Sequence, residues 1–222
     1  MVSRLPAWML MAFSQPRLKR YIRAARGDAQ AAMRLYWWNI EASAALYGPL
    51  HCLEVALRNS LHHRLGLAYG RPDWWAVAPL NLRGQRLVAE ASAKCRRRGN
   101  RAATADDVVA ELSFGFWVSL LSKASGYDRH FWVPALHKAF PHYSGRRDGL
   151  YDSLSSLVLL RNRIMHHEPV HHRDLAADHA KIYRMLGYLS PDLAKEAQAM
   201  DRFPAVLEGK GDALRGDWRH RF

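Results

Sequence analysis

The segment Asp148–Pro169, with the sequence DGLYDSLSSLVLLRNRIMHHEP, decides the fold class, because its apolar residues recur every three or four positions. That spacing places them on one face of an α-helix, where they are expected to form a buried stripe. The stripe comprises Leu150, Leu154, Leu157, Val158, Ile164 and Met165. Because proline lacks a backbone N–H and restricts the residue before it, Pro169 stops this helix, which is predicted to run from Asp148 to about His166.

The same helical spacing dominates the rest of the chain. Apolar residues recur at three and four positions from Ala29 to Leu67, and Gly48-Pro49 is expected to divide that stretch into two helices. Thr104 and Ser190 are predicted helix N-caps, and Gly99 and Asn100 are predicted stop signals. Further helices are predicted over 82–98, 104–122, 130–140, 174–189 and 192–200. Since no alternating run of β-branched residues is long enough to predict a strand, the predicted fold class is all-α.

The chain of 222 residues carries a large positive charge. Lys and Arg number 33 against 20 acidic residues, which gives +13 with histidine neutral. Three explanations of this surplus are ranked by likelihood. Binding to nucleic acid comes first, binding to an anionic membrane surface second, and a basic surface that is only solvated third. Hydrophobic residues make up 49% of the sequence, which is typical of a packed globular protein and not of a disordered one.

The two cysteines, Cys52 and Cys95, have no CxxC partner, so neither a disulfide framework nor a thiolate zinc cluster is expected. This cysteine usage fits a reducing, cytoplasmic location. The apolar stretch at 112–122 is about half of what a bilayer requires, so no membrane span is expected, and a membrane is not among the expected partners.

Two enzyme signatures overlap in the segment RNRIMHHEPVHH, residues 161–172. His167, Glu168 and His171 match the HExxH string of zinc hydrolases, which needs both histidines on one helix so that they face the same metal. Pro169 lies between them and would cost a continuous helix about 3 kcal/mol. The string is therefore interpreted as a coincidence, and neither a metal nor another cofactor is expected.

The second signature consists of Arg161, Asn162 and His166, with the Arg-x4-His spacing of metal-independent ribonucleases. Histidine exchanges protons near neutral pH, and the planar guanidinium of arginine matches phosphate oxygens. Arg161 and His166 are about 140° apart around an ideal helix, so their cooperation requires a distorted last turn or a second copy of the motif in a dimer. The alternative is structural: Arg161 forms a buried ion pair, Asn162 caps carbonyls and His166 stabilises the helix C-terminus.

Four blocks in order carry a resemblance to a known family: RLYWWNIEASAAL (34–46), LEVALRNSL (53–61), ELSFGFWVSLL (111–121) and LRNRIMHHEPV (160–170). With these blocks the chain resembles the Abi-like (abortive infection) proteins of bacteria, a branch of the HEPN superfamily, over residues 17–190. The resemblance implies an all-helical HEPN-type bundle with additional helices, assigned to residues 1–208 as a single domain. A basic C-terminal tail, glycine-rich and loosely ordered, is expected over 209–222.

The resemblance also implies a function, namely metal-independent RNA cleavage in antiphage defence or as a toxin, by a homodimer. The family motif falls on Arg161, Asn162 and His166 as catalytic residues, with His167 and Glu168 supporting them. Met165 departs from the small residue usual at its position. An antitoxin or a regulatory RNA is a further expected partner. The alternative is a non-catalytic RNA- or protein-binding HEPN module, such as an antitoxin-like regulator.

Further residues are predicted to lie at or near the site. Arg58, Asn59 and His63 repeat the Arg-Asn-x-x-x-His spacing one turn after Glu54, and Glu54, Arg58 and Asn59 are expected to support the site. The alternative is that this repeat forms a second half-site within the chain. Basic residues expected to bind RNA phosphates are Arg96, Arg97, Arg98 and Arg163, and the cluster Arg17, Lys19, Arg20 and Arg23 is a further candidate.

Overall fold

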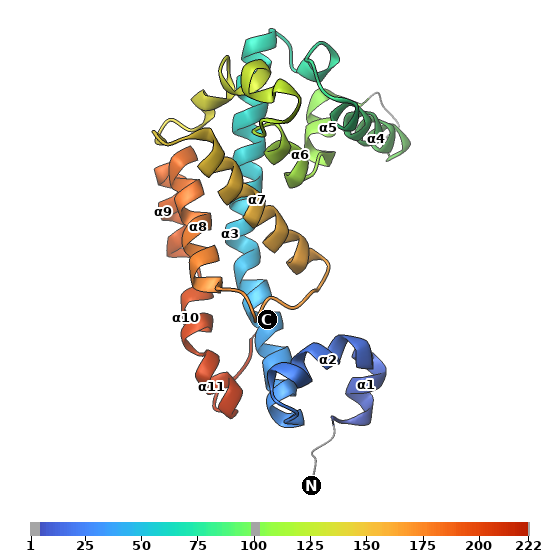
Figure 1. The fold of residues 1–222 in the computed structure, drawn as a ribbon, viewed down its shortest axis with the longest axis vertical. Helices are drawn as coiled ribbons and strands as arrows, with labels where there is room; N and C mark the ends of the chain where they lie inside the picture. The colour runs from blue at the N-terminus through green and yellow to red at the C-terminus, as the bar shows by residue number, and fades with distance from the viewer. Residues whose placement is uncertain (1–4, 99–102, 222) are drawn as a thin grey trace. The chain divides into compact units, whose positions relative to one another are not determined.

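The computed structural model describes residues 5–98 and 103–221, and within these residues the chain forms helices joined by turns, with no strand (Figure 1). The all-α prediction is confirmed. The HEPN topology itself remains a prediction, and the expected stop signals Gly99 and Asn100 lie outside the described residues. None of the described helices is both long and apolar enough to cross a bilayer.

The chain divides into two compact units. Unit 1 comprises residues 1–50, 160–180 and 196–222, and unit 2 comprises residues 51–159 and 181–195. The chain passes between the units within α3 (Ala29–Tyr69), α7 (Arg147–Met165), α8 (Leu175–Leu189) and α9 (Pro191–Ala199).

Helix α3 is a single helix of 41 residues, and the expected division at Gly48-Pro49 is wrong. Pro49 lies inside the helix, where a proline costs about 3 kcal/mol. Leu46, Leu50 and Leu53 around it are each at most 2% exposed, and burial of one leucine contributes about 1.5–3 kcal/mol. Burial on both sides of the proline therefore outweighs the lost backbone hydrogen bond.

Helix α7 confirms the helix predicted from the stretch at 148–169, with bounds one residue away from those expected. Leu150, Leu154 and Leu157 of the predicted stripe are at most 1% exposed. The predicted N-cap Ser190 of α9 is also confirmed, because its hydroxyl accepts a hydrogen bond from Leu193 N at 3.2 Å.

Unit 1 contains α1 (Ala7–Phe13), α2 (Gln15–Ala24), the first half of α3, α10 (Phe203–Glu208) and α11 (Lys210–Arg215). The rings of Tyr21 on α2 and Tyr36 on α3 pack edge to face, with centroids 5.0 Å apart. The fully buried Trp38 donates its indole N–H to Val206 O at 3.0 Å, and this bond ties α10 to α3. Aromatic burial thus joins the N-terminal and C-terminal segments of this unit.

The expectation of a loosely ordered tail is wrong for the described residues up to 221. Residues 210–215 form α11, and the chain after it docks on Glu41 of α3, which is only 2% exposed. Trp218 Nε1, His220 Nδ1 and Arg221 N lie 2.9, 2.8 and 3.2 Å from the carboxylate oxygens of Glu41. A buried carboxylate needs such partners, so the tail is part of the fold.

Unit 2 contains α4 (Leu82–Arg98), α5 (Ala105–Glu111) and α6 (Phe114–Ser119). The predicted N-cap Thr104 is confirmed and forms a capping box with Asp107. The single helix expected over 104–122 is wrong, because Leu112 adopts an extended conformation and Ser113 caps α6 by accepting a hydrogen bond from Phe116 N. Four short helices complete the unit: η1 (Trp74–Ala76), η2 (Ala124–Gly126), the π-helix η3 (Asp128–Trp132) and η4 (Leu136–Ala139).

Candidate active site

The end of α7 carries the predicted catalytic residues, and its backbone follows the Schellman pattern of helix termination. His166 N donates to Asn162 O at 2.9 Å, His167 N to Ile164 O at 3.0 Å and Glu168 N to Arg163 O at 2.7 Å. His167 adopts a left-handed conformation with φ of 56°. A left-handed residue followed by a bond across five positions defines this motif. His166 is consequently the C-cap residue, directly after the last helical residue, Met165.

The structure presents two of the three predicted catalytic side chains to solvent. Asn162 and His166 are exposed, whereas Arg161 is half-buried. Asn162 and His166 are four residues apart and joined by the last α-helical backbone hydrogen bond, so they lie on the same side of the helix end. The backbone leaves helical geometry at His167, after His166, so the convergence of Arg161 and His166 stays a prediction.

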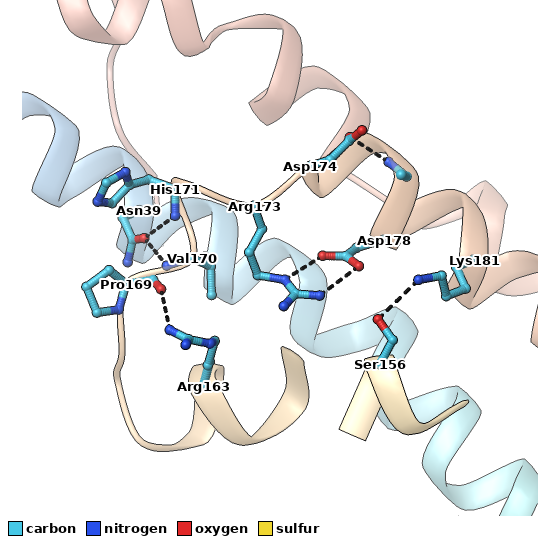
Figure 2. Close-up of polar contacts among 11 residues, drawn as sticks. Asn39, Ser156, Arg163, Pro169, Val170, His171, Arg173, Asp174, Asp178 and Lys181 are labelled. Carbon is cyan, nitrogen blue, oxygen red and sulfur yellow. Dashed lines mark hydrogen bonds and ion pairs between the residues drawn. The ribbon is translucent and has the colours of Figure 1, made fainter. Parts of the chain in front are cut away.

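Asn39 on α3 holds the segment that follows the turn (Figure 2). Its Oδ1 accepts hydrogen bonds from Val170 N at 2.8 Å and His171 N at 3.0 Å. Because both partners are N–H donors, they fix which atom of the amide is the oxygen. Asn39 is 4% exposed, and a buried amide with two such bonds is an effective brace.

Arg17 and Arg163 brace the turn from two further sides. Arg17 on α2 donates from Nη1 to His167 O at 2.6 Å. Arg163 forms an ion pair with Glu168 at 3.2 Å and a long hydrogen bond to Pro169 O at 3.5 Å. Arg163, which is predicted to bind RNA, thus contacts residues of the turn itself. Glu168 stabilises the turn as the partner of this ion pair.

The far end of the same segment is fixed at the start of α8. Arg173 pairs with Asp178 through two hydrogen bonds of 2.7 and 3.0 Å, and Asp174 Oδ1 accepts from Ala177 N at 3.0 Å (Figure 2). Asp178 is 4% exposed, so this bidentate pair is largely shielded from solvent. The chain from His166 to Asp178 is therefore held at both ends and at its middle.

His171 is half-buried in the middle of this segment. Its ring lies 5.0 Å from that of Tyr21, and its Nε2 is buried without a hydrogen-bond partner among the described residues. Burial lowers the pKa of His171 to about 4, helped by the nearby His172 and Lys210. His171 is therefore a neutral packing residue at physiological pH and does not exchange protons there.

A cavity of about 370 Å³ lies next to the turn, and all of its lining residues belong to unit 1. Met165 and His167, the two neighbours of His166 in the chain, form part of its wall, while Arg161, Asn162 and His166 do not. Arg17 and Asn39 also line it. Two of the three residues that brace the turn thus also shape the cavity.

The predicted supporting residues Glu54, Arg58 and Asn59 belong to unit 2. Glu54 and Arg58 are half-buried, Asn59 is exposed, and Arg58 Nε donates to Asn59 Oδ1 at 3.2 Å. Their expected position beside His166 stays a prediction, as does the second half-site that would include His63.

The predicted RNA-binding residues Arg96, Arg97 and Arg98 are exposed in the last turn of α4 in unit 2. Arg98 pairs with Glu111 at 2.8 Å, and Lys94 binds the other oxygen of the same carboxylate. Arg96 and Arg97 are therefore the two guanidinium groups of this cluster that extend beyond the α4–α5 ion pairs.

The HExxH string is not helical. His167 lies in the left-handed turn and His171 follows Pro169 in a non-helical segment, so the prediction that the two histidines do not share a helix is confirmed. Over residues 5–98 and 103–221, no group of three His, Cys, Asp or Glu side chains is arranged to hold a metal ion.

Comparison with models of protein families, with curated proteins and with solved structures finds no match to this chain. The resemblance to Abi-like HEPN proteins therefore rests on the four sequence blocks alone and remains a prediction.

Two contributors to the site were not predicted from the sequence. Asn39 lies within the block RLYWWNIEASAAL, where a polar residue in an apolar helical stretch is the available signal. Arg17 was predicted only as one member of a basic cluster. Its bond to His167 joins residues 150 positions apart, a separation that local patterns do not encode.

Proposed function

We propose that this protein is a metal-independent endoribonuclease of the Abi-like HEPN type, acting in antiphage defence or as a toxin. The observation that supports this most strongly is the exposure of His166 and Asn162 on a turn whose backbone is braced by Arg17 and Asn39. A general acid or base acts efficiently when its position is fixed before the substrate arrives.

The proposed reaction is an internal transfer within RNA. A base takes the proton of the ribose 2′-OH, the 2′-oxygen forms a bond to phosphorus, and the bond from phosphorus to the 5′-oxygen breaks. The leaving 5′-oxygen receives a proton, so the products are a 2′,3′-cyclic phosphate and a 5′-hydroxyl. His166 carries one of the two proton transfers. Arg161 stabilises the charge that grows on the phosphate oxygens.

The second proton transfer is assigned to the same turn of a second copy of the chain. A homodimer would bring two His166 residues to one phosphate, so that one acts as base and the other as acid. The net charge of +13 supports RNA as the substrate, because cationic groups supply most of the affinity for a nucleic-acid backbone. Exposed Arg96 and Arg97 are proposed to contact further phosphates of the RNA.

The second candidate function is a non-catalytic RNA- or protein-binding module. Arg161 favours it, because this side chain is half-buried while the neighbouring Asn162 and His166 are exposed. A half-buried guanidinium is typical of a structural ion pair at the end of a helix. In that case the turn serves as a rigid recognition surface.

The deciding experiment is cleavage of total RNA by the purified chain in EDTA. His166→Ala is the test variant, and His172→Ala is the matched control, an exposed histidine of the same segment. We expect cleavage with cyclic-phosphate ends for the wild type and the control, and a loss of at least a hundredfold for His166→Ala. RNA binding without cleavage by all three proteins would favour the binding module. Equal cleavage by all three would show that His166 has no catalytic role.

A further inference from the structure

We propose that the cavity of unit 1 beside the turn binds a single ribonucleotide, with the base among its tyrosines and the phosphate at Arg17. Its volume of about 370 Å³ is at the small end of the range of about 300–1,000 Å³ found for ligand pockets. Ile40, Ala44 and Ile164 supply apolar walls. The size and the walls suit one flat ring system.

Tyrosines provide the aromatic surfaces of the cavity. Tyr21 and Tyr36 are 1% and 5% exposed and pack against each other, so they form a rigid inner wall. Tyr47 also lines the cavity but is 50% exposed, which places it at the opening. An exposed aromatic face beside an apolar cavity is the feature on which an unstacked nucleobase packs.

Asn39 supplies directional hydrogen-bond donors to the cavity. Its Oδ1 is occupied by the amides of Val170 and His171, while its Nδ2 donates to none of the described residues. The buried polar atoms without a partner do not include Nδ2, so this group of a cavity-lining residue is accessible and can donate to an acceptor on a ligand. The carbonyl oxygens and ring nitrogens of a nucleobase are such acceptors.

Arg17 gives the cavity its charge. Its guanidinium donates to His167 O and also hydrogen-bonds Tyr36, and these two contacts orient the group while leaving others of its five N–H donors for a ligand. None of the described residues that line the cavity is acidic. The ligand is therefore an anion, and the planar guanidinium matches the geometry of a phosphate.

The cavity also lies next to the turn that carries His166. Met165 and His167 line it, and the exposed His166 stands between them in the chain. A nucleotide bound here would place its phosphate on the side of the turn that Arg17 contacts. The link to RNA cleavage rests on the proposed function, whereas the affinity for a nucleotide does not. The nucleotide comes either from RNA or from the free mononucleotide pool.

The test is isothermal titration calorimetry of the full chain with the four ribonucleoside 5′-monophosphates, and with ribose 5-phosphate as a probe that lacks the base. Ala44→Phe fills the cavity from an exposed helical position, and Ala68→Phe makes the same change at an exposed position of α3 outside the cavity. Arg17→Gln removes the cation, with Arg20→Gln as its control on the same helix.

We expect at least one nucleotide to bind the wild type, and ribose 5-phosphate to bind at least tenfold more weakly. Ala44→Phe and Arg17→Gln should each weaken nucleotide binding at least tenfold, while both control variants bind as the wild type does. No nucleotide binding at millimolar concentration, or equal binding by Ala44→Phe and Ala68→Phe, would overturn the proposal.

A short single-stranded RNA distinguishes the two sources of the nucleotide. If Ala44→Phe weakens RNA binding along with nucleotide binding, the cavity holds a nucleotide of the RNA. If only mononucleotide binding weakens, the free nucleotide is the ligand. Because binding is measured without cleavage, the same titrations with His166→Ala separate failure of this site from failure of the proposed nuclease.

Discussion

His167 is one of the non-glycine residues with a positive φ, a backbone conformation that suits its side chain poorly. It occupies the left-handed position of the turn with φ of 56°, where glycine is the usual residue. A Cβ in this conformation costs about 1 kcal/mol or more. The carbonyl of His167 accepts the hydrogen bond from Arg17, so the backbone and not the imidazole carries the bond that braces the turn.

The first prediction follows from this strain. His167→Gly should raise the free energy of unfolding by about 0.5–1 kcal/mol, since glycine adopts the left-handed conformation without penalty. Urea unfolding monitored by tryptophan fluorescence measures the change. His167→Ala is the control, because it also removes the imidazole but keeps the Cβ. A glycine variant no more stable than the alanine variant would contradict the account of strain.

The second prediction concerns His171, whose folded-state pKa is lowered by burial to about 4 from 6.5. Below pH 6.5 the unfolded chain binds a proton that the folded chain does not, so stability should fall as the pH decreases from 6.5 to 4. His171→Phe keeps a ring beside Tyr21 and removes the titration. Urea unfolding across this pH range should show a shallower decline for His171→Phe than for the wild type. His142→Phe, at an exposed histidine, should leave the decline unchanged.

Among the elements, α3 supports the candidate site through Asn39, which accepts hydrogen bonds from two backbone amides of the segment after α7. Val170 is fully buried, so water could not replace Asn39 as the acceptor of its amide N–H. An unsatisfied buried donor costs about 1–3 kcal/mol.

The third prediction is that Asn39→Ala lowers the free energy of unfolding by about 2–4 kcal/mol, because it leaves two N–H donors without an acceptor. It should also lower any RNA cleavage by the chain, since the backbone beside His166 loses a brace. Asn39→Asp keeps the acceptor and should retain most of the stability. Urea unfolding gives the first quantity and the EDTA cleavage assay the second. Equal losses for the alanine and aspartate variants would show that the two amides are not what Asn39 stabilises.

Helix positions were largely predictable from local patterns, and helix breaks were not. The periodicity of leucines located α7, and the capping residues Thr104 and Ser190 located two helix starts. Pro49 predicted a break that burial overrides, while Ser113 caps a helix start inside a stretch that reads as one continuous helix. Propensity is a weak local preference, and the packing that overrides it depends on residues far away in the sequence.

At the scale of the whole molecule, the candidate site depends on contacts between residues distant in the sequence. The Arg-Asn-x-x-x-His spacing located the end of α7, but the bonds from Arg17 and to Asn39 span 150 and 131 residues. The tail was mispredicted for the same reason. Its composition is that of a solvated terminus, and its partner Glu41 lies about 180 residues earlier.

Glu41 makes the C-terminal segment a structural part of unit 1. The carboxylate is 2% exposed and accepts from Trp218, His220 and the backbone of Arg221. Truncation after Gly216 removes all three donors and the indole that covers the carboxylate. The fourth prediction is that this truncation lowers the free energy of unfolding by about 1–3 kcal/mol, because Glu41 exchanges hydrogen bonds within the protein for water.

A double-mutant cycle tests the origin of that loss. Glu41→Gln removes the carboxylate that accepts the hydrogen bonds of the tail and should by itself cost a similar amount, while the truncated Glu41→Gln chain should be little less stable than either single variant. Chemical unfolding of the four proteins gives the coupling free energy. Additive losses would mean that the tail stabilises the fold through its apolar contacts, with Glu41 contributing independently. Strong coupling would establish that a single buried acid on α3 holds the end of the chain in place.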